Sequence, residues 1–296
     1  MTIGNFDGLH RGHQAVLQKL DRHAAAQKLV TSVVTFEPTP QEYFSPATAP
    51  ARLQRLRDKL ALLQTLGVDQ VLCMRFDRQL AGLTATDFVQ RILINGLDVR
   101  YLVVGDDFRF GKGREGDFAF LQKAGRKHGF DVAGTVTCTE CNERVSSTRI
   151  REALVAGEFE TASRLLGRPY RVCGRVAPGQ QRGRSIGFHT ANIHLHRVVS
   201  PVSGVFSVKV YGIGDQPLKG VANIGTRPTV DGSYQVLEVH LFDFDADIYG
   251  RHLNVEFCSK LRDERKFDSF DLLKQQIQLD AEQARQFFSI SECPSE

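Results

Sequence analysis

The sequence lacks the features of a secreted or membrane-embedded protein. No apolar run approaches the roughly 20 residues that a helix needs to span a bilayer. The first residues contain neither the basic region nor the apolar region of a secretory signal peptide. Six cysteines are scattered over 296 residues, whereas small secreted domains carry a dense disulfide framework. We therefore expect reduced thiols and a cytoplasmic location.

Motifs for a zinc ribbon or a P-loop are missing as well. Cys138 and Cys141 form one CxxC pair, and a zinc ribbon would need a second pair that the sequence does not contain. The pattern GxxxxGKS/T does not occur. The formal net charge of +4 permits anionic ligands without demanding a nucleic acid. With 42% hydrophobic and 24% charged residues, the chain has the composition of a folded globular protein.

The first half of the chain alternates between strand-like and helical patterns. Over Arg52–Leu66, leucines recur at steps of three and four residues, and Gly67 follows as a stop signal. Thr84–Asp87 resembles a capping box that opens a further helix. Strands are predicted at residues 30–36, 70–74, 101–104 and 131–136, of which 70–74 is expected to be buried. This alternation predicts βαβ units and a parallel sheet.

The second half changes to short alternating runs that glycines interrupt. Strands are predicted at residues 205–211, 218–222, 236–242 and 253–257, as in an antiparallel sheet or small barrel. The last segment predicts a helix capped by Asp268 or Ser269. Its apolar face comprises Leu273, Ile277, Ala281, Ala284 and Phe288. A capping glycine before a proline at Gly167–Pro169 predicts the boundary between domains 1–167 and 168–290.

The first candidate site follows the first predicted strand. Gly4, Gly8 and Gly12 allow tight turns, and His10 and His13 lie three residues apart at the start of a predicted helix. The positive end of the helix dipole and the imidazole donors suit a polyphosphate whose charge moves onto a leaving pyrophosphate. Two surface histidines are the alternative, but the position in a glycine-rich turn after a strand favours function. This stretch resembles the nucleotidylyltransferase superfamily, whose members hold ATP over such a turn.

Three further segments narrow the resemblance. They are Thr35–Pro40, Val104–Arg114 and Arg144–Arg151. Together with the histidine motif they resemble the adenylyltransferase module of the bacterial bifunctional riboflavin kinase/FAD synthetase family. The resemblance continues into the second half and so covers nearly the whole chain. It implies a Rossmann-like nucleotidylyltransferase domain, then an antiparallel riboflavin-kinase β-barrel with a terminal helix.

The resemblance implies roles for residues of the first domain. His10 and His13 would stabilise the α-phosphoryl transition state and the leaving pyrophosphate. The implied ATP-binding residues are Gly4, Phe6, Asp7, Gly12, Arg144, Ser147, Thr148 and Arg151. Asp107 and Phe108 are implied flavin contacts. From the residues alone, other interpretations stay open: a capped surface helix with solvated arginines at 144–151, a turn-forming aspartate at 107, and core packing by Phe108 and Phe110.

The second candidate site lies in the predicted barrel. The loop Gly179–Phe188 contains glycines and arginines that could present backbone amides and charge to a phosphate. Thr190 and Asn192 offer neutral oxygens that suit Mg²⁺. Residues 220–229 and 237–241 extend the resemblance to the riboflavin kinase module, which implies that Gly179, Gly183 and Arg184 bind ATP and that Thr190 and Asn192 bind its Mg²⁺ complex.

By the same resemblance, Glu238 is the general base on the ribityl 5′-hydroxyl. A placed carboxylate can accept the proton that the alcohol loses when it attacks the γ-phosphoryl group. An outward-facing residue of a strand is the alternative for Glu238, because Val236 and His240 share its face. Arg262 is implied to lie near the flavin.

Two departures from the family pattern affect these expectations. His189 stands where the family usually has proline, and proline would stiffen the approach to Thr190 and Asn192. Family members also carry a longer segment before Thr2–Asp7. We expect that extending the chain upstream raises the thermal stability of the first domain.

Three hypotheses follow, of which the first is preferred. The barrel phosphorylates riboflavin to FMN with MgATP, and the first domain joins FMN to the AMP part of a second ATP, releasing pyrophosphate. Alternatively, the chain is an FMN adenylyltransferase whose barrel is impaired by His189. The third hypothesis is a non-catalytic RNA-binding barrel with arginines at 175, 182 and 184, but no aromatic RNA-binding signature supports it.

Overall fold

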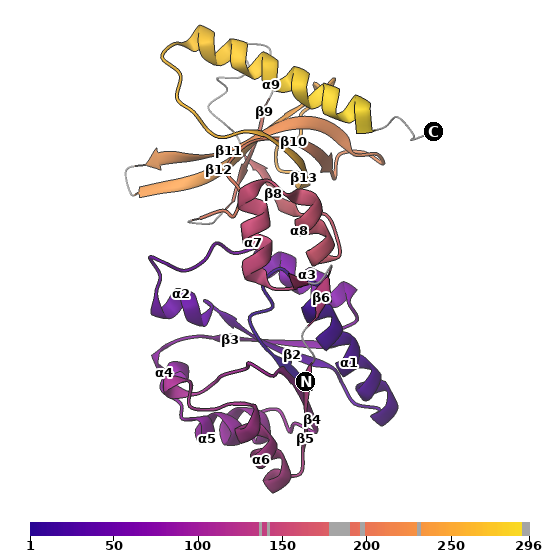
Figure 1. The fold of residues 1–296 in the computed structure, drawn as a ribbon, viewed down its shortest axis with the longest axis vertical. Helices are drawn as coiled ribbons and strands as arrows, with labels where there is room; N and C mark the ends of the chain where they lie inside the picture. Colours follow the sequence, from indigo (N-terminus) through magenta and orange to yellow (C-terminus); the bar gives the residue numbers. More distant parts are fainter. Residues whose placement is uncertain (136–137, 141–142, 178–189, 196–198, 230–231, 292–296) are drawn as a thin grey trace. The chain divides into compact units, whose positions relative to one another are not determined.

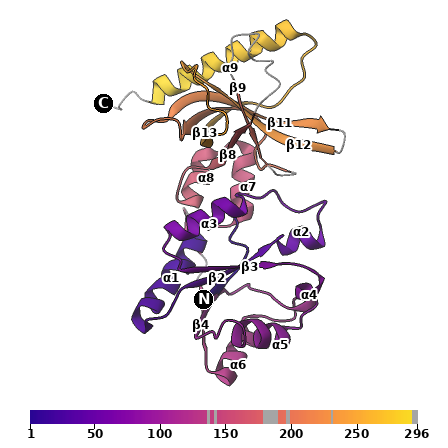
Figure 2. The ribbon, with the colours of Figure 1, turned by 180° about the vertical axis from the view of Figure 1, so that it is seen from behind.

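The computed structural model describes residues 1–135, 138–140, 143–177, 190–195, 199–229 and 232–291. The chain folds into two compact units, shown from opposite sides in Figures 1 and 2. Unit 1 comprises Met1–Pro50 and Gln54–Ser147, and unit 2 comprises Ala51–Leu53 and Thr148–Glu296. The domain boundary predicted after residue 167 lies further along the chain than this division, and it stays a prediction.

Unit 1 is built on a parallel five-stranded sheet in the order β3-β2-β1-β4-β5. The strands are β1 (Thr2–Ile3), β2 (Ser32–Glu37), β3 (Gln70–Arg75), β4 (Tyr101–Gly105) and β5 (Asp131–Thr135). The strand order changes direction between β1 and β4. Ligands of open parallel sheets bind outside the carboxyl ends of the strands at such a switch point. The loops after β1 and β4 are therefore the first place to look for a site.

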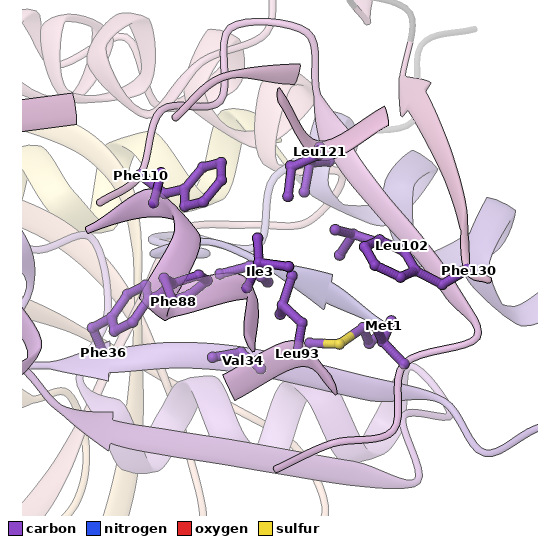
Figure 3. Packing of buried hydrophobic residues seen from close by; sticks show 14 residues of the cluster. Met1, Ile3, Val34, Phe36, Phe88, Leu93, Leu102, Phe110, Leu121 and Phe130 are labelled. Carbon is purple, nitrogen blue, oxygen red and sulfur yellow. The ribbon is translucent and has the colours of Figure 1, made fainter. Parts of the chain in front are cut away.

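Helices cover both faces of this sheet. They are α1 (Arg11–Gln27), α2 (Pro40–Phe44), α3 (Leu56–Thr65), α4 (Arg78–Ala81), α5 (Ala85–Phe88), η1 (Val89–Ile94), η2 (Lys112–Arg114) and α6 (Phe118–His128). Val33 packs with Leu17 of α1 and Leu63 of α3. Because consecutive strand residues point to opposite faces, Val34 joins a second cluster that includes Leu93 of η1 (Figure 3). A short antiparallel pair of strands, β6 (Thr139–Glu140) and β7 (Glu143–Arg144), completes the unit.

The prediction that residues 70–74 form a buried strand is wrong. The strand exists, but β3 is the outermost strand of the sheet, and Leu72 and Cys73 are exposed along it. A short apolar run has the same composition at an edge as at the centre of a sheet, so the pattern alone cannot distinguish them. The cap predicted at Thr84 is confirmed, because its hydroxyl oxygen accepts a hydrogen bond from the backbone N–H of Asp87 at 3.0 Å.

In unit 2, two helices precede a closed barrel along the chain. The helices are α7 (Ser147–Ala156), whose first residue belongs to unit 1, and α8 (Phe159–Leu166). The barrel has the strand order β10-β11-β12-β9-β8-β13, and all pairings are antiparallel. Its strands are β8 (Arg171–Ala177), β9 (Thr190–His194), β10 (Gly204–Tyr211), β11 (Leu218–Thr229), β12 (Gly232–Leu241) and β13 (His252–Arg262).

The terminal helix α9 (Phe270–Ser291) lies against the outside of the barrel (Figure 1). Ala281, Ala284 and Phe288 are buried in a cluster with Val205 and Val221, as the predicted apolar face requires. Of the two caps considered, Ser269 is the one observed, because its Oγ accepts a hydrogen bond from the N–H of Leu272 at 3.2 Å. The predicted fold class is confirmed. Among the helices that the structure describes, none combines the length and apolarity that crossing a membrane requires.

Candidate functional site

The loop between β1 and α1 has an unusual backbone. Phe6, Gly8 and Leu9 have φ values of 47°, 84° and 42°. Residues other than glycine disfavour this left-handed region, so Phe6 and Leu9 are strained there. Such backbone strain persists where the surrounding structure holds the chain in place. The loop also lies at the switch point of the sheet. Both observations mark it as a candidate site.

Side chains from outside the motif hold alternate carbonyl groups of this loop. Lys59 Nζ donates to the carbonyl oxygen of Asn5 at 2.6 Å. Ser147 Oγ donates to that of Asp7 at 2.9 Å, and Gln14 Nε2 to that of Leu9 at 2.9 Å. Two donors from distant parts of the sequence, Lys59 and Ser147, and a nearby one, Gln14, thus fix the path of the strained backbone.

Lys59 is a residue that the sequence analysis missed. Its side chain is only 4% exposed, although lysine is almost never fully buried without partners. Its Nζ also lies 3.5 Å from the hydroxyl of Thr35. Lys59 follows Leu56 by three residues and precedes Leu63 by four, so it lies on the apolar face of α3. That position within a leucine pattern is the signal that would have found it.

His10 and His13 lie together, as predicted. His10 is the N-cap of α1, and its Nδ1 accepts a hydrogen bond from the backbone N–H of His13 at 3.3 Å. The two rings stack with centroids 3.7 Å apart. Because Nδ1 acts as an acceptor, the neutral His10 ring carries its proton on Nε2, which can donate. A Cβ at Gly12 would come within 3.2 Å of the His10 ring, so glycine leaves room for this stack.

The other predicted ATP residues of this loop have different surroundings. Phe6 is 3% exposed and packs in the core with Leu17 and Val33. A Cβ at Gly4 would lie 3.3 Å from the Phe6 ring, so this glycine permits that packing. Asp7 is 9% exposed, and its Oδ1 accepts a hydrogen bond from the N–H of Gln54 at 3.4 Å. Phe6 and Asp7 therefore present mainly backbone to a ligand.

Two ion pairs connect β6 and β7 to the loop after β4 and to the first residue of α1. Arg144 lies 2.8 Å from Asp107, the predicted flavin contact after β4, and their side chains are 61% and 68% exposed. Arg11, within the histidine motif, lies 2.7 Å from Glu140. Exposed pairs of this kind contribute about 1 kcal/mol or less, so an incoming anion can displace the carboxylate from Arg144. The structure thus brings two predicted ligand-binding residues together.

A cavity of about 660 Å³ lies beside the loop that follows β4. Six phenylalanines line it: Phe36, Phe44, Phe76, Phe88, Phe108 and Phe110. The rings of Phe108 and Phe110 are stacked with centroids 5.7 Å apart. Phe110 is buried in the core and Phe108 packs half-buried against it, which agrees with the core-packing interpretation; a flavin contact by Phe108 stays a prediction. Aromatic walls of this kind suit a flat, largely apolar ring system.

Thr148 and Arg151 belong to unit 2. There, Arg151 Nε donates to the carbonyl oxygen of Ala51 at 2.6 Å. Their predicted role in ATP binding stays a prediction.

In the barrel, strand pairing aligns the predicted kinase residues in one row. Asn192 of β9 pairs with Glu238 of β12, and Glu238 pairs with Asn223 of β11. The row continues through Val205 to Arg262. The adjacent positions Val176, Ile193, Leu237 and Ile224 are nearly inaccessible and fill the barrel interior. Residues 192, 238, 223, 205 and 262, which we call the outer row, therefore face outward.

The oxygen donors at one end of the outer row fit a magnesium ion. Thr190 and Asn192 alternate along β9 and so share the face of Glu238. Asn192 is 7% exposed, and its Nδ2 lies 3.4 Å from the carbonyl oxygen of Thr190, which directs its amide oxygen elsewhere. Hydroxyl and amide oxygens are ligands that Mg²⁺ accepts together with phosphate and water.

Arg262 is fixed at the other end of the row. Its Nε and Nη2 contact the Asp280 carboxylate of α9 at 2.9 and 2.7 Å, and Asp280 is buried. Gln276 Nε2 donates to the same carboxylate at 2.7 Å.

The predicted contacts Gly179, Gly183 and Arg184, and also His189, lie outside the residues that the structure describes.

Comparison with known proteins identifies both units. A family model for FAD synthetase matches residues 1–149, and one for riboflavin kinase matches residues 166–288. The bifunctional riboflavin kinase/FMN adenylyltransferase of Escherichia coli (strain K12) is 54% identical over 291 residues, covering 98% of this chain and 93% of that protein. The protein of the same name from Haemophilus influenzae is 50% identical over 289 residues, covering 98% and 94%.

A solved structure is also similar over almost the full length. It is described as a macrolide-efflux protein from Streptococcus pneumoniae, with a TM-score of 0.80, 32% identity, and coverage of 96% of this chain and 93% of that one. This chain shares about half of its residues with the two bacterial enzymes over nearly their whole length, and both family models match it in the same order. These matches determine the family of the chain. The chain belongs to the family of bifunctional riboflavin kinase/FMN adenylyltransferases.

Proposed function

We propose that this chain makes both flavin cofactors in two steps, using riboflavin, FMN and ATP as substrates. The barrel transfers the γ-phosphoryl group of ATP to riboflavin and gives FMN. The parallel-sheet unit then transfers the AMP part of a second ATP to FMN and releases pyrophosphate, giving FAD. The observation that carries this proposal is the presence of two separate polar sites: the stacked imidazoles of the β1–α1 loop, and the outer row around Glu238.

In the adenylyl-transfer site, the loop and its histidines bind the triphosphate. An oxygen of the FMN phosphate attacks the α-phosphorus, and the bond from this phosphorus to the β-phosphate oxygen breaks. Charge then moves onto pyrophosphate, where His10 Nε2–H, His13 and the N-terminus of α1 can stabilise it. Gly4, Phe6, Asp7 and Gly12 contribute backbone, and Ser147, Thr148, Arg144 and Arg151 complete the phosphate contacts in this proposal.

The phenylalanine-lined cavity is the place we propose for the isoalloxazine ring of FMN. Phe108 lies on its wall, half-buried, where a ring can stack on it. Asp107, in the loop after β4, and Arg144, in β7, form an ion pair, and both are exposed. Arg144 is thus placed to exchange its contact with Asp107 for a phosphate, while Asp107 becomes available to the flavin.

In the kinase site, Glu238 accepts the proton of the ribityl 5′-hydroxyl as this oxygen attacks the γ-phosphorus. The bond from the γ-phosphorus to the β-phosphate oxygen breaks, and ADP leaves. Thr190 and Asn192 would hold Mg²⁺ with the ATP phosphates, and the ion would offset the charge of the polyphosphate. Arg262, which Asp280 holds in place, borders the flavin in this proposal.

We also propose a cytoplasmic location, because the cysteines are scattered along the chain, as in proteins of a reducing compartment.

The experiment that tests the function is a product assay. The protein is incubated with MgATP and either riboflavin or FMN, and the flavins are separated by chromatography. We expect FMN and then FAD from riboflavin, and FAD from FMN. FAD from FMN alone would mean that the barrel does not phosphorylate riboflavin, as in an adenylyltransferase with an impaired kinase. No new flavin from either substrate would reject both activities.

A further inference from the structure

We propose that Asn223 is a substrate-contacting residue of the kinase site, whose amide oxygen accepts a hydrogen bond from a hydroxyl group of the ribityl chain of riboflavin. This inference rests on the proposed kinase function of the barrel. It concerns a residue that neither the spacing of motifs nor the family resemblance had given a role.

The strand register places Asn223 beside the predicted base. Asn223 of β11 is directly opposite Glu238 of β12, which is directly opposite Asn192 of β9. Side chains at directly paired positions project from the same face of a sheet, with Cβ atoms about 4.5–5.5 Å apart. The alcohol that Glu238 deprotonates therefore comes within reach of the Asn223 amide.

The amide oxygen of Asn223 requires a donor. Oδ1 is buried, and no described residue donates a hydrogen bond to it. Buried polar atoms in folded proteins almost always have a partner, and a persistent exception indicates a bound group that supplies one. This atom lies in the outer row, next to a carboxylate expected to face substrate.

The surroundings of Gly225 support the orientation of the amide. A Cβ added at Gly225 would lie 3.4 Å from Asn223 Nδ2 and would collide with the carboxylate of Glu264. The nitrogen end of the amide thus lies on the side of a negatively charged group, which favours a donor there. The oxygen end is the one left for a ligand. Glycine at 225 also keeps this region open for the Glu264 carboxylate.

At the point of phosphoryl transfer beside Glu238, the two substrates offer different groups to the amide oxygen of Asn223. The phosphate groups of ATP, as MgATP, present acceptor oxygens and cannot donate to an amide oxygen. The ribityl chain carries several hydroxyl donors, and the one next to the reacting 5′-hydroxyl is at C4′. A hydrogen bond to a neighbouring hydroxyl orients the 5′-oxygen towards Glu238 without competing for the proton, because an amide is not a base at neutral pH.

The test combines a variant with substrate analogues. Asn223→Leu keeps the approximate shape and removes the acceptor. We expect kcat/KM for riboflavin phosphorylation to fall by about 10- to 100-fold, the range for losing a hydrogen bond to a buried polar group in a specific site. The KM for ATP and the rate of FMN conversion to FAD stay unchanged. Asn254→Leu is the matched control, because Asn254 lies elsewhere on the barrel, paired with Cys173.

The decisive arm uses riboflavin analogues that each lack one ribityl hydroxyl. For the wild type, the analogue without the partner hydroxyl shows a similar loss in kcat/KM. For Asn223→Leu, removing that hydroxyl causes no further loss, because the interaction is already absent. Equal losses for every analogue in both proteins would overturn the proposal.

Two controls keep the outcome interpretable. Should Asn223→Leu fail to fold, Asn223→Asp retains an acceptor oxygen and must keep the discrimination between riboflavin and the partner-deficient analogue; its loss would count against the proposal. If the wild type makes no FMN from riboflavin, the proposed kinase function itself fails. If the wild type makes FMN but the analogue series shows no coupling with residue 223, only the present inference fails.

Discussion

A single buried lysine illustrates how the β1–α1 loop depends on residues outside its motif. Lys59 Nζ donates to Asn5 in a loop where Phe6 and Leu9 adopt left-handed backbone conformations. Without that donor, the carbonyl of Asn5 loses a charged hydrogen-bond partner. The position of His10, at the end of the same loop, then becomes less fixed.

We expect Lys59→Met to lower kcat for FMN adenylylation by about 10- to 100-fold, because small displacements of catalytic groups have effects of this size. Riboflavin phosphorylation by the barrel is unchanged. The measurement is steady-state kinetics of each half-reaction. Lys123→Met, at an exposed position of α6, is the control and leaves both rates as in the wild type. Equal loss of both activities in Lys59→Met would contradict a role confined to this loop.

Asp69 provides a prediction for pH dependence. Hydrogen bonds from the backbone N–H and hydroxyl of Thr31 lower the pKa of Asp69 below its ordinary value. A carboxyl with a depressed pKa in the folded state stabilises the fold above its unfolded pKa of about 4, and this contribution is lost as the pH falls through the folded pKa. The contacts join the segments that precede β2 and β3.

We therefore expect Asp69→Asn to unfold more easily than the wild type at pH 7. The difference between the two proteins shrinks as the pH is lowered below about 4, because the wild type then loses its ionised carboxylate too. Circular dichroism during denaturant unfolding, at a series of pH values, measures this difference. A difference that stays constant as the pH falls through the whole acid range would show that the charge of Asp69 is irrelevant.

Among the secondary-structure elements, α9 shows what local sequence rules can predict. The spacing of Ala281, Ala284 and Phe288 fixes its buried face, and a polar residue before Phe270 marks its start. The edge position of β3 was not predictable in the same way, because it depends on which strands pair. The same limit applies to Lys59, since its partner Asn5 is distant in sequence and belongs to another element.

The N-cap of α9 gives a prediction for this element. Ser269→Ala removes the acceptor for the N–H of Leu272, and N-cap removal typically costs about 0.5–2 kcal/mol. We expect a loss of this size in the unfolding free energy of the transition that includes the barrel. Ser289→Ala is the matched control near the other end of the helix, where the hydroxyl donates to the carbonyl of Arg285 and caps nothing. Equal effects of both changes would argue against capping.

For the whole molecule, the sequence predicts the two fold types and the family more readily than the geometry of either site. Alternating patterns separate a parallel sheet from a barrel, and the spacing of His10 and His13 already places two imidazoles together. The part of the outer row around Glu238 depends on the register of three strands, since Asn223 and Asn192 meet Glu238 only through pairing. Alternation indicates the face of each residue and leaves its neighbours undetermined.

The central claim is that two independent sites on one chain act in sequence, with FMN as the product of the first and the substrate of the second. One measurement tests it, with two variants: Glu238→Gln, and the double variant His10→Asn, His13→Asn. Each variant is first incubated alone with riboflavin and MgATP, and the two variants are then incubated together with the same substrates. We predict that the first alone leaves riboflavin unchanged and the second alone accumulates FMN, whereas the mixture forms FAD. A mixture without FAD, although each variant is folded, would contradict the account.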